Sequence, residues 1–457
     1  MTVNLRNDGS PSPARLEEPT MSDLLNRRHF LSTSVATATA ASLVPVGVAQ
    51  EEKTPPANDE IIVGVMGLGR GHSLARSFTQ QDGVKMKYAC DIDDYRASAC
   101  ADDIEKSAGY RPETISDFRQ ILDDPDIDVL VCAAPNHWHA PATIMACNAG
   151  KHVYVEKPCS HNPWEGEMMV KAARKNQRCV QMGSQRRSSD AFITAVQKLH
   201  EGIIGRVYQS QSWYNSLRPS MGKGVAAEVP AHFDYDLWQG PAPRVPYKEY
   251  IMGDARNHHY NWHWLWHWGN GELGNNGVHA LDICRWGLGV DYPVRVTSSG
   301  GRYRWDDDQE TPDTHVVAFE FEDKQQITWT GLSCNKHTIG SGFVGFFGEE
   351  GSMEIDGNGN TKIYDRADKL IEEFSGSYDQ NVHIANLLSA IRNDDPMSLF
   401  AEIETGHKST LLCHLGNIAH RTGRTLICRP EDGHIIGDEK AMGYWKREYE
   451  PGWEPTV

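Results

Sequence analysis

The sequence lacks three features that would each indicate a particular class of protein. Its ten cysteines include no CxxC pair, which argues against a zinc knuckle or a disulfide framework. No apolar run is long enough for a stable membrane anchor. Basic residues are not in excess either, since the formal net charge is -17 and the pI is near 5.6. Because a phosphate backbone is held by clustered Lys and Arg, we expect no nucleic-acid partner.

The first fifty residues do not have the pattern of a folded domain. Arg27 and Arg28 are adjacent, and Phe30, Leu31 and an apolar run rich in Ala, Thr and Ser follow them. A positive start, a short apolar stretch and small residues near a cleavage point are typical of a signal peptide. The paired arginines resemble a twin-arginine signal, which implies export of the folded protein to the periplasm. The alternative is a disordered basic tail.

Residues 51–59 are polar and contain two prolines, which indicates a linker. The chain of 457 residues is too long for one ordinary core, so two domains are expected after this linker. From residue 60 to residue 184, short apolar runs such as IIVGVM and DIDVLVC alternate with stretches of helical character. This alternation predicts an α/β Rossmann domain with a doubly wound parallel sheet.

Residues 185–430 have a different pattern. Segments such as THVVAFEFED and QQITWTGLS alternate apolar and polar residues, which predicts an α+β domain with a largely antiparallel open sheet. Residues 381–392 and 402–421 read as helices that would cover one face of this sheet. Residues 431–457 are expected to form a C-terminal tail.

The first glycine turn predicts a nucleotide site. Gly67 and Gly69 stand where a strand turns into a helix predicted from about His72 to Gln80, so the backbone can approach a pyrophosphate, and Arg70 in this turn is a further candidate for cofactor binding. The fingerprint is imperfect, because the third glycine is Gly71 instead of residue 72. Asp91 ends the second strand about twenty residues later, where a carboxylate accepts the ribose hydroxyls and repels the extra phosphate of NADP. The expected cofactor is therefore NAD, with NADP disfavoured.

Two further turns lie at predicted strand ends, where an open α/β sheet builds its site. One contains Asn136 and His139, and the other is Glu156-Lys157-Pro158. Together with the downstream segment GNGELGNNGVHALDICRWGLG, they resemble the Gfo/Idh/MocA oxidoreductases, over roughly residues 60–430. The resemblance implies a cofactor site that includes Asn136, His139, Glu156 and Lys157. It also implies hydride transfer to or from a secondary hydroxyl of a sugar or polyol.

In that family, the lysine and histidine that correspond to Lys157 and His279 are catalytic. The resemblance implies that His279 takes the hydroxyl proton, while the Lys157 ammonium stabilises the developing alkoxide. Relatives of inositol dehydrogenase carry an aspartate where this chain has Asn275, and an amide cannot stabilise an imidazolium by charge. Asp282, one turn beyond His279, is a candidate to orient the imidazole; the alternative is a pair with Arg285.

The segment HHYNWHWLWHWGNG is the most unusual composition in the chain. If it is extended, its tryptophans at positions 262, 264, 266 and 268 share one face, which could stack on a sugar. Trp262 and His263 are therefore candidate substrate-binding residues; the alternative is an aromatic core or an interface. Arg186 is a further candidate, with a surface role expected for it or for Arg187. No metal is expected, because the spacing of the histidines does not come with a regular helix.

The sequence thus predicts a periplasmic NAD-dependent oxidoreductase that holds its cofactor tightly and acts on a carbohydrate. A homo-oligomer, dimer or tetramer, is expected through the open sheet. Two alternatives stay open. One is redox-assisted cleavage of a glycoside, in which NAD is recycled; the other is a carbohydrate sensor without catalysis, which Asn275 favours.

Overall fold

The computed structural model describes residues 60–250, 257–338, 340 and 342–457. The predicted signal peptide and linker, residues 1–50 and 51–59, lie outside the described residues. Within the described part of the chain, no helix has the length and apolar character that crossing a bilayer requires.

The N-terminal domain is a doubly wound parallel sheet of six strands, as the sequence predicts. The strand order is β3-β2-β1-β4-β5-β6, and every pairing is parallel. The strands are β1 (Ile61–Met66), β2 (Val84–Cys90), β3 (Glu113–Ile115), β4 (Val129–Cys132), β5 (His152–Val155) and β6 (Val180–Met182). The helices are α1 (Arg70–Thr79), α2 (Asp94–Ala108), α3 (Arg119–Asp123), α4 (Asn136–Asn148) and α5 (Pro163–Asn176). The strand order reverses between β1 and β4, so the crevice for a ligand lies at their carboxyl ends.

The second domain contains a large mixed sheet that is antiparallel except where β7 pairs with β12. Its order is β17-β16-β15-β14-β7-β12-β11-β10-β18. The strands are β7 (Val207–Leu217), β10 (Arg295–Gly301), β11 (Thr314–Phe321), β12 (Gln325–Leu332), β13 (Cys334–Asn335, paired with β7), β14 (Val344–Gly348), β15 (Gly351–Ile355), β16 (Thr361–Asp365), β17 (Leu370–Phe374) and β18 (Leu426–Ile427). Burial alternates along β11 and β12, so only one face of these strands is buried.

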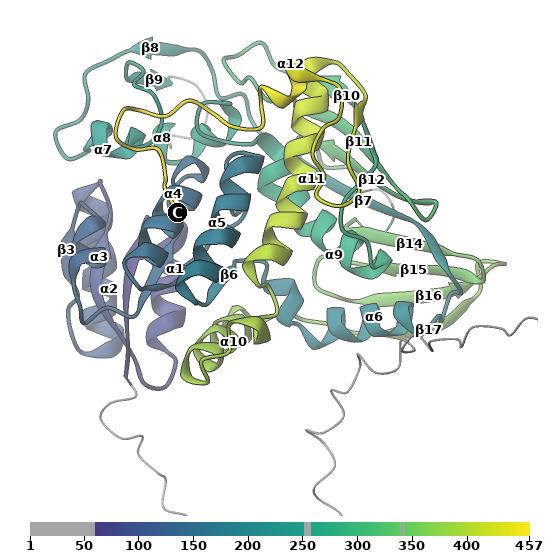
Figure 1. Cartoon of the computed structure of the whole chain (residues 1–457), viewed down its shortest axis with the longest axis horizontal. Helices are drawn as coiled ribbons and strands as arrows, with labels where there is room; N and C mark the ends of the chain where they lie inside the picture. Colours follow the sequence, from purple (N-terminus) through teal and green to yellow (C-terminus); the bar gives the residue numbers. More distant parts are fainter. Residues whose placement is uncertain (1–59, 251–256, 339, 341) are drawn as a thin grey trace, which may run out of the picture. The chain divides into compact units, whose positions relative to one another are not determined.

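Helices α6 (Asp190–His200), α9 (Val278–Leu288) and α11 (Ile403–Thr422) pack on the buried face of this sheet. The prediction for residues 402–421 is therefore confirmed. The helix predicted over residues 381–392 is confirmed, but its expected place on this sheet is wrong, because α10 (Gln380–Arg392) packs on the Rossmann core through Ile384, Leu387 and Leu388. In Figure 1, α10 lies below the Rossmann helices and away from the green strands. An amphipathic pattern shows that a helix has an apolar face, but not which of two cores receives it.

Residues 431–457, expected to form a C-terminal tail, pack first on the core of the second domain, through Ile435, Ala441 and Trp445, and then against the Rossmann domain. They contain α12 (Glu439–Met442) and the buried Trp445. Further along, Arg447 donates to Glu165 on α5 (2.8 Å), and Trp453 packs edge-on against Trp138 on α4. These residues are part of the folded protein, since their aromatic and charged side chains find partners that are distant in sequence.

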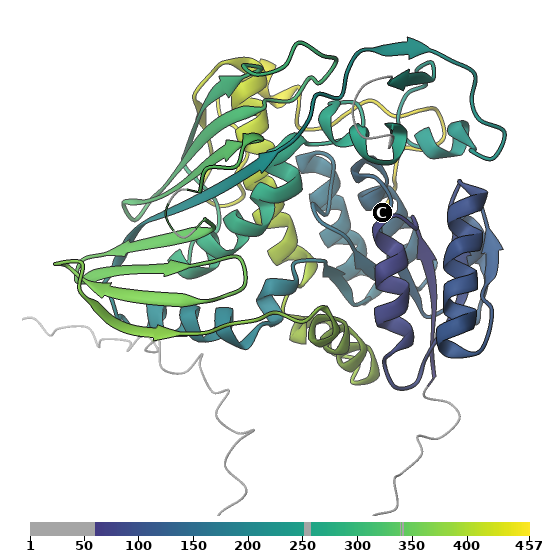
Figure 2. The same ribbon diagram turned by 180° about the vertical axis from the view of Figure 1, so that it is seen from behind.

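A long excursion between β7 and α9 lies beside the carboxyl edge of the Rossmann sheet (Figures 1 and 2). We call residues 218–250 and 257–268 the cover segment; its elements are β8 (Gly224–Ala226), α7 (Tyr235–Gln239), β9 (Lys248–Tyr250), α8 (Asn257–Tyr260) and η3 (Asn261–Trp264). Backbone hydrogen bonds join it to the turn after β2, from Asp94 N to His232 O (3.2 Å) and from Asp234 N to Ile92 O (3.0 Å). The cover segment is thereby fixed next to the Rossmann crevice.

Candidate active site

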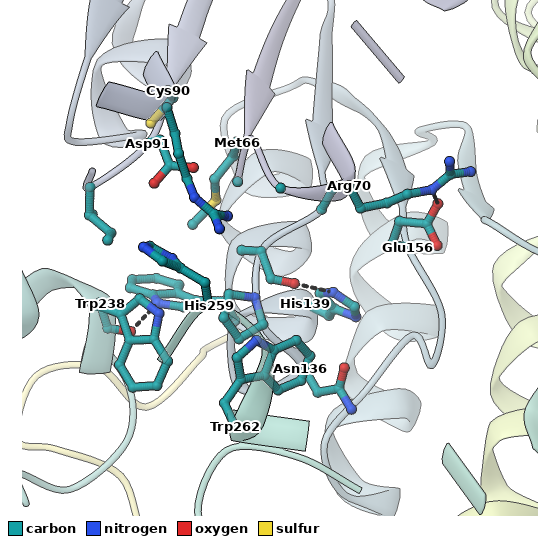
Figure 3. Close-up of a pocket in the computed structure, with 18 of the residues that line it drawn as sticks. Met66, Arg70, Cys90, Asp91, Asn136, His139, Glu156, Trp238, His259 and Trp262 are labelled. Carbon is teal, nitrogen blue, oxygen red and sulfur yellow. Dashed lines mark hydrogen bonds and ion pairs between the residues drawn. The ribbon is translucent and has the colours of Figure 1, made fainter. Parts of the chain in front are cut away.

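A cavity of about 580 Å³ lies between the carboxyl edge of the Rossmann sheet and the cover segment. Figure 3 shows Cys90 and Asp91 toward one end, the Arg70–Glu156 pair toward the other, and Trp238, His259 and Trp262 on the opposite side. The lining also includes Gly67, Gly69, Asn136, His139, Lys157, Tyr260 and His263. All eight predicted cofactor-binding residues therefore line one cavity, together with the predicted substrate residues Trp262 and His263.

The glycine turn fits a pyrophosphate. Gly67 has a φ of +84°, and a Cβ there would lie 2.6 Å from the backbone nitrogen of Ala134. Only glycine permits both this conformation and this close approach. Helix α1 begins directly afterwards with no side-chain cap, so its first N–H groups can receive an anion. Gly71 takes over the packing role of the missing third glycine, because a Cβ there would lie 3.1 Å from Val65 of β1.

Asp91 is held at the end of β2 by the glycine turn itself. Its two carboxylate oxygens accept the backbone N–H groups of Leu68 (2.6 Å) and Asp93 (3.0 Å). Burial raises the pKa of this carboxyl, while the two N–H donors and the charge of Arg96 lower it. The remaining lone pairs face the cavity, where they can accept ribose hydroxyls. Turn, helix N-terminus and carboxylate thus fit a dinucleotide.

The other predicted cofactor residues mostly brace the cavity wall. Arg70 Nε donates to Glu156 (3.1 Å), and its guanidinium also contacts Gln380. Both nitrogens of His139 face carbonyl oxygens, those of Pro158 (2.6 Å) and Ala134 (2.7 Å). A neutral imidazole donates to only one of these, and burial lowers the pKa of His139. His139 therefore ties the end of β4 to the turn after β5.

Asn136 links the two domains. Its side-chain amide donates to Asn270 Oδ1 (2.9 Å), and Asn270 in turn donates to His161 O (2.9 Å). The backbone oxygen of Asn270 accepts from Asn417 on α11 (2.9 Å). This buried amide network joins α4, the glycine-rich segment and α11 at the cavity wall.

Lys157 and His279 converge at this edge of the sheet. Lys157 follows β5, precedes a cis peptide bond to Pro158 and lines the cavity. Its Nζ donates to the backbone oxygen of Asn275 (2.7 Å) and to the Asn275 side chain (3.2 Å). His279 lies four residues after Asn275, where the π-helical turn η4 (Leu273–Gly277) runs into α9. Such π-helical turns occur frequently at functional sites.

The π-helical turn beside Lys157 depends on one glycine. A Cβ at Gly274 would lie 2.5 Å from Asn270 Cβ and 3.6 Å from the ring of Pro158. The conflict with Asn270 shows that the tight winding of the π-helical turn requires a glycine here, whereas the contact with Pro158 would be an ordinary van der Waals contact.

Both titratable groups of this pair favour their neutral forms more than usual. Burial lowers the pKa of Lys157, although the charges of Glu156 and Glu272 raise it. Burial, and then the charges of Lys157, Arg186 and Arg70, hold the pKa of His279 well below its usual range. Among the described residues, neither nitrogen of His279 has a hydrogen-bond partner. His279 is therefore a neutral imidazole with lone-pair capacity at neutral pH.

Asp282 does not orient His279. Its carboxylate accepts Arg187 Nε (2.8 Å) and Ser409 Oγ (2.6 Å), and the side chain is 1% exposed. Arg285 pairs instead with Asp291 (2.8 Å), so the alternative pairing of Asp282 with Arg285 is wrong as well. The expectation of a surface role for Arg186 or Arg187 is also wrong. Arg187 is buried in this ion pair, and Arg186 is partly buried between aromatic rings.

The tryptophan run is not extended, so its indoles do not share a face. Residues 261–264 form the short helix η3, and the four rings diverge. Trp262 lines the cavity and stacks on His263, with ring centroids 3.6 Å apart. Trp264 packs under the Arg218 guanidinium, Arg421 lies over Trp266, and Trp268 packs edge-on against Trp238.

The histidines of this run are engaged separately. His263 Nδ1 contacts Tyr260 O (2.6 Å), His267 contacts Pro243 O (2.8 Å), and His259 pairs with Asp93 (2.9 Å). No group of three or more His, Cys, Asp or Glu side chains with metal-binding geometry occurs in the described ranges.

Comparison with known proteins identifies the family. Residues 61–184 match the Gfo/Idh/MocA model described as "Oxidoreductase family, NAD-binding Rossmann fold", and residues 217–454 match the model of its C-terminal alpha/beta domain. The chain belongs to the Gfo/Idh/MocA oxidoreductase family. The resemblance seen in the sequence is confirmed, and the N-terminal domain is an NAD-binding domain.

Individual relatives of this Gfo/Idh/MocA protein are distant. A glycosyl hydrolase family 109 protein from Shewanella pealeana is 26% identical over 211 residues, which are 42% of this chain and 46% of that protein. The chain therefore spans about half the length of the curated relatives that it matches. The WlbA dehydrogenase from Bordetella pertussis, solved with NADH and UDP-GlcNAcA, has a TM-score of 0.59 at 19% identity, with 81% of this chain and 99% of that one covered. Aldose-aldose oxidoreductase from Caulobacter crescentus, solved with glycerol, has a TM-score of 0.59 at 18% identity, with 80% and 99% covered. Both structures share the fold.

The site of this oxidoreductase contains one charged cluster that sequence reasoning missed. Arg218 pairs with Glu272 (2.6 Å) and also contacts the hydroxyl groups of Tyr214 and Tyr260. The ion pair is largely buried. Burial lowers the pKa of Arg218, but the charge of Glu272 outweighs this effect, so the pKa of Arg218 is raised. Glu272 lies in the segment GNGELGNNGVH, close to Asn275. This position is the signal by which the sequence could have identified Glu272 as a residue of the site. Its partner Arg218 comes from a different stretch of chain and carries no such signal.

Proposed function

We propose that the chain transfers hydride between NAD and a secondary hydroxyl of a sugar, glycoside or cyclitol. The observation that supports this most is the convergence of Lys157 and His279 at the carboxyl edge of an NAD-binding sheet. Strand ends at this edge are where open α/β folds place their chemistry. Family membership supplies the reaction class, and the carbohydrate is the substrate class that we infer.

The two side chains divide the acid–base work. When held by the Gly67 turn and Asp91, NAD would supply the acceptor for the hydride that leaves the carbon bearing the hydroxyl group. The Lys157 ammonium donates a hydrogen bond to the hydroxyl oxygen and stabilises the negative charge that develops there. The neutral imidazole of His279 accepts the hydroxyl proton, so that a carbonyl compound and an imidazolium are formed. Asn275 fixes Lys157 through its backbone and side-chain oxygens and stays uncharged.

We infer a preference for NAD over NADP and slow exchange of the cofactor. The Asp91 carboxylate lines the ribose end of the cavity and opposes an added phosphate. The cover segment is tied to the Rossmann domain across the cavity by two backbone hydrogen bonds and the His259–Asp93 pair. Protein purified from its natural compartment should carry NAD, and purification with an empty site would contradict this inference.

The roles of Lys157 and His279 are tested by Lys157→Met and His279→Gln. Each variant should lower kcat by about a hundredfold or more while NAD and ligand binding persist, because general acid–base groups contribute about 10²–10⁴ to rate. Matched controls are Lys198→Met and His200→Gln, whose side chains contact Glu372 and Trp286 O on the second domain. Unchanged turnover in both active-site variants would overturn the proposal, and binding without any turnover in the wild type would favour the sensor alternative.

A second candidate function is supported by the family 109 relatives. Transient oxidation of a glycoside acidifies a neighbouring ring C–H, elimination releases the aglycone, water adds, and the hydride returns to the sugar. Such a reaction hydrolyses the glycosidic bond with no net change in NAD. A panel of chromogenic glycosides, with nicotinamide absorbance and aglycone release followed together, separates the two functions. Net NADH formation supports dehydrogenation, and release without it supports hydrolysis.

We also propose export and self-association. Residues 1–50 should direct the folded protein to the periplasm, and replacing Arg27 and Arg28 by lysine should block export by the twin-arginine route. The unburied face of the large sheet exposes Tyr208 and Val316, each 41% exposed, and is the surface proposed for a dimer or tetramer. Light scattering of the wild type and of Val316→Lys tests this association, and a monomeric wild type would contradict it.

A further inference from the structure

Arg186 is a cation without an anionic partner near the proposed reaction centre. It lies in η2 (Gln185–Ser188), directly after β6 at the carboxyl edge of the Rossmann sheet. Its guanidinium lies between two aromatic rings, 4.6 Å from the Phe343 centroid and 5.0 Å from the Tyr378 centroid. Its Nε donates to the backbone oxygen of Gly357 (3.1 Å). These contacts hold the side chain in one orientation.

The charge of Arg186 is not compensated by the protein. Among the described residues it forms no ion pair, and its two terminal nitrogens make no hydrogen bond. The carboxylate that acts on it, Asp356, is engaged by its own loop, where it accepts N–H groups of Asn358 (2.8 Å) and Asn360 (3.0 Å). Burial lowers the pKa of Arg186, and the charge of Asp356 does not offset this. Two parallel donors therefore remain available to a ligand.

Both neighbours of Arg186 in the chain are anchored to the active centre. Gln185 donates to Tyr154 Oη (2.9 Å) and to Glu156 (3.4 Å), next to Lys157. On the other side, Arg187 pairs with Asp282, which lies one helical turn beyond His279 on α9. The short helix η2 is thus fixed between the turn that carries Lys157 and the helix that carries His279. The charge of Arg186 lowers the pKa of both groups.

The surroundings of His279 are unusually positive for this protein. Lys157, Arg70 and Arg186 all act on the imidazole, whereas Glu156 is the carboxylate that compensates Arg70. The chain as a whole has a formal net charge of -17. A desolvated, uncompensated cation is costly unless an anion from a ligand completes it.

We propose that Arg186 receives a carboxylate of the substrate, so that the natural carbohydrate is a sugar acid such as a uronic acid or a uronide. Because Nε is occupied by Gly357 O, the two terminal nitrogens remain, and their fork matches the two oxygens of a carboxylate. This inference rests on the proposed function, since it names the substrate class for the same site. Sulfate and phosphate esters also present two anionic oxygens to a guanidinium, so they are the alternative occupants that the experiment distinguishes from a carboxylate.

The experiment compares matched sugars on the NAD-loaded protein. Glucose, glucuronate, glucose 6-phosphate and glucose 6-sulfate, with the corresponding galacto series, are assayed for binding by calorimetry and for hydride transfer by NADH absorbance. We expect the uronates to bind and react about tenfold to hundredfold better than the neutral sugars, the range for a hydrogen-bonded charge pair. In Arg186→Gln this ratio should fall to within about twofold, chiefly because KM for the uronates rises more than KM for the neutral sugars; Arg186→Lys should restore part of the ratio.

Arg206→Gln is the matched control, because Arg206 forms an exposed pair with Glu349 (3.0 Å) outside the site. Equal use of neutral and acidic sugars by the wild type, or equal losses on both in Arg186→Gln, would overturn the inference. Preference for the phosphate or sulfate esters would overturn the carboxylate assignment. If uronates bind in an Arg186-dependent manner but none is oxidised, the proposed function fails and the carboxylate site stands. If neutral sugars are oxidised and uronates are not, the proposed function stands and the carboxylate site fails.

Discussion

The two walls of the cavity are built in different ways. The Rossmann wall is made of strand ends and one glycine turn. In this turn, a Cβ on Gly67 would lie 2.6 Å from the backbone nitrogen of Ala134. The cover wall is attached by contacts between residues far apart in sequence, such as His259 with Asp93 (2.9 Å) and Trp138 Nε1 with Trp238 O (2.9 Å). Backbone packing leaves the first wall few alternatives, whereas individual side-chain contacts can open one by one. We therefore expect the first wall to determine whether NAD binds and the second to determine how fast it leaves.

The joint between the two regions should show the largest effect. Asp282→Asn leaves the Arg187 guanidinium buried without its counter-ion, and breaking such a pair costs roughly 3–5 kcal/mol of unfolding free energy. Urea unfolding measures this loss. The matched control is Glu349→Gln, which removes a carboxylate that is 52% exposed from the exposed Arg206, and should cost about 1 kcal/mol or less. Similar losses in both variants would show that the buried pair does not hold α9.

The Rossmann wall is tested by Gly67→Ala. The new Cβ would lie 2.6 Å from a backbone nitrogen that cannot move without shifting β4, so we expect NAD affinity to fall by about tenfold to hundredfold, the equivalent of roughly 1–3 kcal/mol of overpacking. Gly109→Ala is the control: its φ is +80°, but nothing lies within 4 Å of the added Cβ. Both variants carry the same left-handed backbone cost, so calorimetric titration with NAD isolates the contact. Equal NAD affinities of the two variants would show that the backbone of Ala134 shifts to accommodate the added Cβ.

The sequence was most informative about the Rossmann wall, for the same reason that this wall is rigid. Gly67, Asp91 and Lys157 are each read from a short local pattern, a strand followed by a turn, and the parallel sheet brings these turns to one edge. Family resemblance added His279, and the structure brings it to Lys157. These residues could be selected before the fold was known because their positions depend on local spacing.

The cover wall could not be predicted in this way. Trp262 and Trp264 alternate with other residues as they would in a strand. The short helix η3 and the packing of Arg218 over the Trp264 ring nevertheless separate their side chains. The partner of Asp282 is Arg187, 95 residues earlier, and no spacing rule connects the two. Helix α10 likewise has an apolar face that suits either domain. In each case the deciding contact is long-range, and one sequence contains no signal for it.

Asn275→Asp tests the catalytic pair Lys157 and His279, and we expect an effect of intermediate size on its pH dependence. In the wild type the pKa of His279 is held well below its usual range and the pKa of Lys157 is lowered, so kcat/KM should stay flat toward mildly acid pH and decline on the alkaline side as Lys157 loses its proton. A carboxylate at position 275 stabilises both charged forms and raises both pKa values. Both limbs of the profile should then move to higher pH, by about one unit. A profile that does not move would mean that neither group titrates in the reaction.

The cover wall should give the smallest effect, in His259→Gln. Burial lowers the pKa of His259 to about 4, against the opposing charge of Asp93, so the closed state holds a neutral imidazole. Losing one such hydrogen bond should speed NAD release by about two- to tenfold, while equilibrium folding is unchanged. Because the ring takes up a proton more readily once the cover opens, release from the wild type should accelerate as pH falls from about 6.5 toward 4, and this acceleration should vanish in His259→Gln. Stopped-flow release of NADH, followed by its fluorescence, measures the release rate and its pH dependence. Identical rates in the wild type and His259→Gln would place the barrier to release in the backbone hydrogen bonds of Asp94 and Asp234.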